Sequence, residues 1–372
     1  MKTQYKSDYI ILIVVLLLVT IGLVFVYSAS MYNAQVTYNN RYFFLSKQSV
    51  GALVGVVALV FCWKIPLERV KKLWVVGVVL SAVLLVLVFV PGIGIENYGA
   101  NRWIGFGSFS LQPSELAKFS YVLFCAVFMS RRDMKKFGNC LVVIAVGVAF
   151  CALIIAEPNM SITMCMAMIM MVMLFVGGAR WKHLFLMLFP IVLAVPLLIL
   201  LEPYRMLRLL AFWDPWASPK GEGYQLIQSL YALGGGGWFG RGLFNSIQKY
   251  RFLPFSESDF VFAIIGEETG LVGCLIVFSL YALLVIRGVR IAVNCNDRFC
   301  CFLSCGITSV IAVQSLLNFA VVTGSIPPTG LPLPFISYGG TSLVVFMAAV
   351  GLLLNISKNI SSTNIGGFLW IT

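Results

Sequence analysis

Charged residues are scarce in this chain of 372 residues: they make up 11% of it, against roughly 25% in an ordinary soluble domain. Hydrophobic residues make up 60%, and together these fractions exclude a soluble protein. Since a membrane-spanning helix needs about 20 apolar residues, the hydrophobic fraction is enough for roughly ten spans and leaves little for a separate folded domain. We therefore expect one all-α polytopic membrane domain over residues 1–372.

Acidic residues are fewer than basic ones, with 14 Asp and Glu against 26 Lys and Arg, and a net charge of +12 in a soluble protein would suggest nucleic-acid binding. The positions argue otherwise, because most basic residues lie in short segments that all fall on one side of the predicted spans. This is the positive-inside pattern, so we expect both termini in the cytoplasm and no nucleic-acid partner. The residues on that side are Lys2, Lys6, Lys64, Arg69, Lys71, Lys72, Arg131, Arg132, Lys135, Lys136, Arg180, Lys182, Arg287, Arg290, Arg298 and Lys358.

Histidine is nearly absent, since His183 in a basic turn is the single one, which argues against a zinc site built from histidine and cysteine. The ten cysteines lie in apolar runs or on the cytoplasmic side, so we expect no disulfides. The predicted cytoplasmic turns are short and leave no room for a nucleotide-binding domain. An ATP-driven pump built from this chain alone is therefore excluded.

Ten apolar runs of spanning length are present, and they begin near Tyr9, Gln48, Leu73, Glu115, Cys140, Ser161, Leu184, Phe260, Cys300 and Thr341. The first run, residues 9–27, is followed by a sequence that resembles a signal-peptidase site. It exceeds the length of a signal-peptide core, so we expect a retained helix. The predicted outer segments are residues 28–47, 91–114, 157–160, 202–259 and 324–340, the long one lying between helices 7 and 8. Their polar, Gly-rich and Pro-rich content indicates an outward-open cavity.

The second outer segment leads through Arg102, Trp103, Gln112 and Ser114 into a helix that starts with ionisable residues. Glu115 and Lys118 are three residues apart and share one helical face. Ionisable groups in a membrane helix are costly and usually functional when they face a cavity. The alternatives are a pair that satisfies itself or a lysine that snorkels outward.

The long outer loop contains a run of glycines at residues 234–237, with Arg241, Lys249 and Arg251 after it. Glycines let backbone amides approach an anion closely. No Gly-Lys-Ser/Thr follows, so the run is not a Walker loop, and taken alone it is better interpreted as a flexible turn. With the cations nearby, the loop suggests a re-entrant segment beside a phosphate-bearing ligand.

Asp259 is the acidic residue closest to the membrane on the outer side. A carboxylate in a partly dehydrated site has a raised proton affinity, which suits it to act as a general base. The alternative is that Asp259 caps the N-terminus of the eighth span. Further along, the prolines between residues 323 and 340 preclude a regular helix and predict a rigid re-entrant or cavity-lining loop.

Several stretches together resemble one known family, the SEDS proteins (shape, elongation, division and sporulation). The string Pro-Leu-Pro-Phe-Ile-Ser-Tyr-Gly-Gly at residues 332–340 is close to diagnostic, and the resemblance covers nearly the whole chain. Residues 223–229, 236–240 and 242–246 resemble the division-type FtsW branch more than the elongation-type RodA branch. The chain departs from the common pattern at Asn159, where an Asp is usual, at Phe244, where a Gly is usual, and at residues 255–258, which precede Asp259.

The resemblance implies a peptidoglycan glycosyltransferase in the bacterial cytoplasmic (inner) membrane that polymerises lipid II on the outer side. It implies a class B penicillin-binding protein as partner, with other division proteins and membrane lipids around it. Asp259 matches the family's essential loop aspartate and would be the general base of an inverting transfer. Arg102, Lys118, Arg241 and Lys249 would balance the diphosphate, with Mg²⁺ or Mn²⁺ and no organic cofactor. The other expected cavity residues are Trp103, Gln112, Ser114, Glu115, Glu157, Tyr224, Gln225, Ser337 and Tyr338. Glu257 would replace a lost acidic group.

Two functions of other classes remain open at the level of the residues. A flippase that moves lipid II without chemistry would also need many spans, a wet cavity and internal ions. It would need a gate on the cytoplasmic side as well, where the turns offer no comparable polar motif. The second is a scaffold that only docks division proteins. Within the same reaction class, an elongation-type polymerase is a further alternative.

Overall fold

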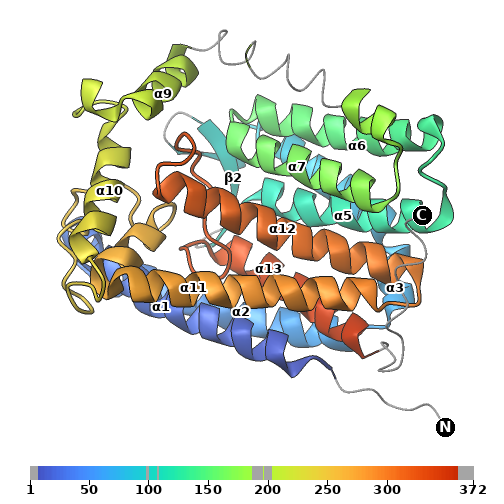
Figure 1. Ribbon diagram of the computed structural model, residues 1–372, viewed down its shortest axis with the longest axis horizontal. Helices are drawn as coiled ribbons and strands as arrows, with labels where there is room; N and C mark the ends of the chain where they lie inside the picture. Colours follow the sequence, from blue (N-terminus) through green and yellow to red (C-terminus); the bar gives the residue numbers. More distant parts are fainter. Residues whose placement is uncertain (1–6, 98–99, 107–108, 187–195, 197–202, 359–372) are drawn as a thin grey trace.

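The chain forms a bundle of roughly parallel helices with a small sheet and a structured loop at one end (Figure 1). The structure is a computed structural model and describes residues 7–97, 100–106, 109–186, 196 and 203–358. Its helices are α1 (Tyr9–Tyr38), α2 (Phe43–Lys64), α3 (Leu67–Lys72), α4 (Trp74–Leu87), α5 (Pro113–Arg131), α6 (Phe137–Ala156), α7 (Met160–Val176), α9 (Pro203–Trp213), α10 (Tyr224–Gly236), α11 (Val261–Val293), α12 (Arg298–Val322) and α13 (Gly340–Ser357), with a 3₁₀ turn η1 (Pro215–Ala217).

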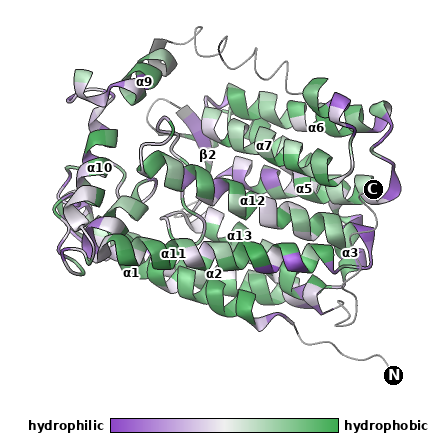
Figure 2. Cartoon of the chain, viewed as in Figure 1, coloured by the Kyte–Doolittle hydropathy of each residue, from purple (hydrophilic) through white to green (hydrophobic). Residues whose placement is uncertain are grey.

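Hydrophobic residues cover the bundle helices along most of their length (Figure 2). Six helices in the described part of the chain are long and apolar enough to cross a membrane, and α4 and α7 are shorter apolar helices. α12 is the most buried of these spans and contacts α5, α7, α11 and α13. α2 exposes large apolar side chains such as Leu53 and Val57, as expected of a lipid-facing helix. The predicted polytopic helical fold is confirmed.

Each predicted apolar run coincides with a helix, except the run near Leu184, most of which lies outside the described residues. The number of ten spans therefore stays a prediction. The backbone N–H of Asp8 donates to Ser357 Oγ at 3.0 Å, so the two ends of the described chain meet at one end of the bundle. This agrees with two termini on the same side of the membrane.

One predicted boundary is wrong. α1 does not end at Tyr27 but continues to Tyr38, so residues 28–38 of the predicted outer segment are helical. Ser28 is fully buried and its hydroxyl donates to Glu268 Oε1 of α11 at 2.6 Å. The helix continues because Ser28 faces α11 and pairs with Glu268 there, whereas the apolar run ended at Tyr27.

The outer segment after α4 forms an antiparallel sheet in the order β1-β2-β3, which the sequence analysis did not predict. Its strands are β1 (Gly94–Asn97), β2 (Ala100–Phe106) and β3 (Phe109–Leu111). In the register, Trp103 pairs with Ile95, and Ile104 pairs with both Gly94 and Leu111. The sheet positions Arg102 and leads directly into Pro113, the first residue of α5.

α11 is interrupted at Gly270, whose φ of 70° and ψ of −167° are not helical. The break lets the glycine-rich segment pack backbone to backbone against the helix: Leu271 N donates to Gly237 O at 2.9 Å, and Arg241 N donates to Glu267 O at 2.9 Å. A Cβ on Gly240 would lie 2.2 Å from Glu268 O, so a side chain there is excluded. The glycine run is thus a fixed contact with α11 and not a flexible turn.

Candidate active site

Asp259 lies in the turn that precedes α11, at the end of the bundle that carries α9 and α10. Phe260, and not Asp259, is the N-cap residue of α11, so the capping alternative is wrong. The Asp259 carboxylate instead lies against Gly330 in the proline-rich loop, where a Cβ would be 3.2 Å from Asp259 Oδ2. Gly330 has a φ of +72°, so glycine both fits the left-handed backbone and makes room for the carboxylate.

Side chains of α12 and the proline-rich loop hold the turn of Asp259 in place. Asn318 Nδ2 of α12 donates to Asp259 O at 2.8 Å and to Leu331 O at 2.7 Å. Tyr338 N donates to Glu257 O at 2.9 Å, and the Ser337 hydroxyl donates to Ser258 O. The loop before α13 is therefore non-helical, as predicted, and acts as the scaffold of the Asp259 turn.

The pKa of Asp259 is raised to about 6, mostly by burial and in smaller part by the negative charge of Glu257. The hydrogen bond from Ser258 and the positive charges of Arg208 and Arg102 oppose this rise. Burial also raises the pKa of Glu257 itself. Near neutral pH the Asp259 carboxylate is mostly ionised, so it is free to accept a proton. Its raised pKa also makes it a stronger base than an ordinary aspartate, and both properties suit general-base chemistry.

Arg102 of β2 reaches the turn between α6 and α7. Its Nε donates to Glu157 O at 3.3 Å, and its Nη2 donates to Pro158 O at 2.6 Å. Asn159, at one of the departures from the family pattern, caps α7 by accepting a hydrogen bond from Ile162 N. The positive charge of the Arg102 guanidinium thereby acts to lower the pKa of both Glu157 and Asp259.

Arg208 of α9 was not singled out from the sequence. Its Nε lies 3.6 Å from Glu222 Oε2, and its Nη1 donates to Pro328 O at 3.5 Å in the proline-rich loop. In the sequence it is one of several basic residues of the long outer loop, and no pattern there indicates that α9 turns back toward the proline-rich loop that supports Asp259. Arg102 and Arg208 thus supply positive charge from two separate elements.

Glu115 and Lys118 form a second, fully buried network in the core of the bundle. Lys118 Nζ lies 2.7 Å from Glu115 Oε1 and also donates to the amide oxygen of Gln314. Ser342 Oγ donates to the other Glu115 oxygen at 3.0 Å. Gln314 Nε2 in turn donates to Pro332 O at 2.9 Å, so the pair is linked through α12 to the loop that supports Asp259.

The remaining expected cavity residues lie around these two networks. Gln112 and Ser114 are buried at the start of α5, and Trp103 is partly buried on β2. Gln225 Nε2 donates to Pro254 O at 3.3 Å, which ties α10 to the Asp259 turn, and Tyr224 begins α10. Whether each of these residues contacts substrate stays a prediction.

Arg241 and Lys249 pair with acidic residues of α11. Lys249 is fully buried, with Nζ 3.4 Å from Glu268 Oε1, while the partly exposed Arg241 lies 3.7 Å from Glu267 Oε1. Glu267 also accepts hydrogen bonds from the amides of residues 247 and 248, and Glu268 from those of residues 244 and 246. Phe244, which stands where the family commonly has glycine, has a φ of +64°. This cluster anchors the loop, and the geometry favours Arg102 and Arg208 as the cations beside Asp259.

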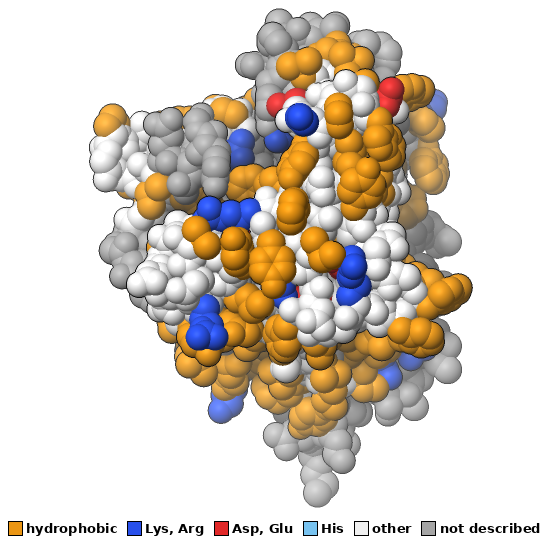
Figure 3. Space-filling model, turned by 90° about the vertical axis from the view of Figure 1, so that its left-hand side faces the viewer, with side chains coloured by type: hydrophobic (Ala, Val, Ile, Leu, Met, Phe, Trp, Pro, Cys, Tyr) orange, Lys and Arg blue, Asp and Glu red, His pale blue; other side chains and the backbone are white. Residues whose placement is uncertain are grey.

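The surface at this end is basic and apolar. Figure 3 shows Lys and Arg side chains spread among apolar ones, with few acidic side chains. Such a surface suits an amphiphilic anion, because the apolar part can contact its hydrocarbon and the cations its charge.

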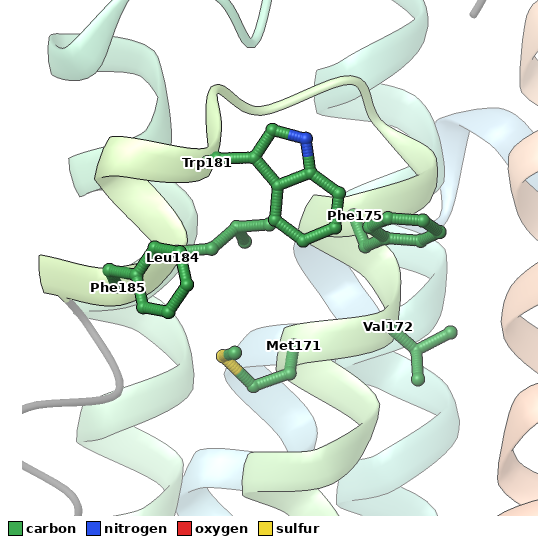
Figure 4. Close-up of a pocket in the computed structure, with 6 residues that line it drawn as sticks. All are labelled: Met171, Val172, Phe175, Trp181, Leu184 and Phe185. Carbon is green, nitrogen blue, oxygen red and sulfur yellow. The ribbon is translucent and has the colours of Figure 1, made fainter.

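The cavity in Figure 4 is of a different kind. It has a volume of about 290 Å³ and lies at the end of α7 that the charge pattern places in the cytoplasm. Its lining offers no acid, base or nucleophile and suits hydrocarbon, so the cavity is not part of the candidate active site. The lining residues are Met171, Val172, Phe175, Trp181, Leu184 and Phe185.

Comparisons with known proteins agree over nearly the whole chain. The family model FTSW_RODA_SPOVE, described as a cell cycle protein, matches residues 8–362. Stage V sporulation protein E of Bacillus subtilis is 42% identical over 364 residues, which cover 96% of this chain and 99% of that protein. The probable peptidoglycan glycosyltransferase FtsW of Geobacter metallireducens is 37% identical over 372 residues, which cover 98% of each.

Solved structures show the same fold. A chain of a peptidoglycan synthase complex, described as coordinating polymerization and crosslinking, matches with a TM-score of 0.80 and 29% identity, over 96% of this chain and 99% of that one. The rod shape determining protein RodA of Thermus thermophilus matches with a TM-score of 0.71 and 25% identity, over 95% and 97%. The chain described here therefore belongs to the FtsW/RodA/SpoVE family of cell cycle proteins.

Proposed function

We propose that this chain is a peptidoglycan glycosyltransferase that polymerises lipid II into glycan strands on the outer face of the cytoplasmic membrane, in cell division. The observation that carries the proposal is the partly buried Asp259, with its pKa raised to about 6 and the charges of Arg102 and Arg208 acting on it. The names of the relatives supply the reaction class and support the division role. A wall-forming enzyme also needs its chemistry outside, where the charge pattern places this end of the bundle.

In the proposed reaction Asp259 takes the proton of the 4-hydroxyl of the acceptor GlcNAc. The hydroxyl oxygen forms a bond to C1 of the donor MurNAc, and the bond from C1 to the phosphate oxygen breaks with inversion. Undecaprenyl diphosphate leaves with its electron pair, and Arg102 and Arg208 balance the charge that develops on it. Lys118 is buried against Glu115, so its contribution would be to position the scaffold loop through Gln314.

Mg²⁺ or Mn²⁺ fits this site as a companion of the substrate. No cluster of three or more metal-ligating side chains occurs among the residues that the structure describes. Mg²⁺ usually keeps several waters and binds substrate phosphates, so the diphosphate of lipid II would supply its main ligands here. Bound there, the ion would add positive charge beside the departing diphosphate.

We further propose a class B penicillin-binding protein as the partner, because the matching structure comes from a complex that couples polymerization to crosslinking. The lipid II flippase remains the alternative of another class. Labelled lipid II in detergent micelles separates the two, since polymer formed in micelles cannot result from transport. We expect glycan polymer from the purified chain with its partner, and product from the chain alone would show whether the partner is required. A preparation that binds lipid II but yields no polymer under either condition contradicts the proposal.

The two charged neighbours of Asp259 are expected to shift the pH dependence of polymerisation in opposite directions. The rate should rise with pH through about 6, because the base must be ionised. Arg208→Gln removes a charge that lowers the pKa of Asp259, so the rising limb moves to higher pH. Glu257→Gln removes a charge that raises this pKa, so the limb moves to lower pH. Rate measurements across pH 5–8 test this, and equal shifts of one sign in both variants would contradict the assignment.

Replacing Gly330 by alanine should damage catalysis more than stability. The new Cβ would lie 3.2 Å from Asp259 Oδ2, and the backbone has a φ of +72°. Gly92→Ala is the matched control, because Gly92 has a φ of +86° and open space around its Cβ position. Both variants are expected to lose about 1–2 kcal/mol of stability, whereas only Gly330→Ala should lose roughly tenfold or more in rate. Thermal unfolding and polymerisation assays on the same preparations give both quantities.

A further inference from the structure

Two side chains near Asp259 carry buried polar atoms and make no hydrogen bond among the described residues. They are Glu157, whose side chain is fully buried and whose two carboxylate oxygens are both unpaired, and Thr329, whose buried hydroxyl is unpaired. Buried polar groups in folded proteins are nearly always paired. Leaving one unpaired costs about 1–3 kcal/mol, so both groups require an explanation.

Glu157 and Thr329 belong to the same corner of the molecule as Asp259. The Ser161 hydroxyl of α7 donates to Thr329 O, which joins the turn of Glu157 to the proline-rich loop. Thr329 directly precedes Gly330, against which the Asp259 carboxylate lies. Arg102 completes the connection, because it binds Glu157 O while its charge acts on Asp259.

The protonation state of Glu157 indicates which chemistry it can recognise. Burial raises its pKa to about 8, and the charge of Arg102, on the neighbouring β2, opposes this rise only in part. At neutral pH the group is therefore mostly a neutral carboxylic acid with one donor and one acceptor, like the Thr329 hydroxyl. Such a pair complements uncharged hydroxyl and amide groups. Neither of these two side chains carries the positive charge that binds a phosphate, and a metal ion would be repelled by the Arg102 guanidinium.

We propose that Glu157 and Thr329 form a saccharide subsite that hydrogen-bonds to uncharged hydroxyl or acetamido groups of the N-acetylated sugar reacting at Asp259. The subsite rests on the proposed function and adds to it the part of the substrate that these residues recognise. Arg102 and Arg208 face the diphosphate, and the neutral pair faces the sugar. Glu157 transfers no proton in this scheme.

Binding measured without turnover tests the subsite, with all variants made in an Asp259→Asn background. We expect Glu157→Leu to weaken binding of fluorescent lipid II about tenfold, as the loss of one well-placed hydrogen bond to a buried group predicts. Glu157→Gln keeps a neutral donor and acceptor and should bind within about threefold of its parent. Thr329→Val should weaken binding about five- to tenfold. Thr323→Val is the control, because the Thr323 hydroxyl already donates to Phe319 O at 2.8 Å.

Two further measurements complete the test. One distinguishes recognition of the sugar from recognition of the diphosphate, and the other distinguishes the neutral form of Glu157 from its ionised form. Undecaprenyl diphosphate, which lacks the sugars, should bind the Glu157→Leu variant as it binds the parent, and this also shows that the variant is folded. Lipid II binding by the parent should weaken as pH rises through about 8, where Glu157 ionises, and Glu157→Gln should remove that dependence. Equal loss for both ligands, or a Gln variant as weak as Leu, overturns the proposal. Normal lipid II binding without polymerisation by the chain that keeps Asp259 would contradict the proposed function and leave the subsite intact.

Discussion

Asp259→Asn is expected to lower the rate of lipid II polymerisation at least about 100-fold, because general-base catalysis typically contributes 10²–10⁴-fold. Asparagine keeps the size of the side chain, and the scaffold holds the backbone at this position through Asn318, so the fold should persist. Substrate binding should therefore change little, and the loss should appear in kcat. The residual rate should also lose the rising limb near pH 6 that the carboxylate produces.

The control for this variant is Glu257→Gln, which removes the neighbouring carboxylate two residues away. It should retain much of the native rate at neutral pH, because Glu257 affects the reaction only through its charge on Asp259. A comparable collapse of rate in both variants would indicate that the acidic turn acts as a unit, for example as a metal site, and not through one base.

The buried pair in α5 predicts the largest effect on stability. Lys118→Met should lower the free energy of unfolding by about 3–5 kcal/mol, because it leaves the Glu115 carboxylate buried without its partner. Both side chains are fully buried, so water cannot compensate for the lost charge. Thermal or denaturant unfolding of the purified protein in detergent measures the difference.

A double variant, Glu115→Gln with Lys118→Met, should recover most of this loss, since removing both charges of a buried pair is often neutral. Lys220→Met, at an exposed position of the outer loop, should change stability by less than about 0.5 kcal/mol. If Lys118→Met unfolds like the native protein, the pair is hydrated and the buried network described above is wrong.

The helices could be predicted from the sequence because membrane-spanning segments require long apolar runs, and these runs are visible residue by residue. The same holds for the loop before α13, where closely spaced prolines exclude a helix. The end of α1 was not predictable in this way. Ser28 and Ser30 look like the start of a loop until α11 places Glu268 opposite Ser28. The sheet was missed because its strands are short and lie between turns.

In the candidate active site, the family pattern identified Asp259 as the catalytic residue. Which charged side chains pair with one another in space could not be predicted from the sequence. Arg241 and Lys249 resemble diphosphate ligands in sequence, yet Glu267 and Glu268, just before the break in α11, bind them. Gln314 and Asn318 were a missed signal. They are polar residues four apart in an apolar span, which is costly in a membrane and indicates a partner on one face of the helix. Those partners are the loop carbonyls of Pro332 and Leu331.

In the proposed mechanism this chain forms glycan from lipid II with Asp259 as the base. The direct measurement is the initial rate of polymer formation in detergent micelles by the native chain and by Asp259→Asn, each with its class B penicillin-binding protein and each shown to bind lipid II. We predict polymer from the native chain and at least about 100-fold less from the variant at equal binding. Polymer at the native rate from Asp259→Asn would contradict it.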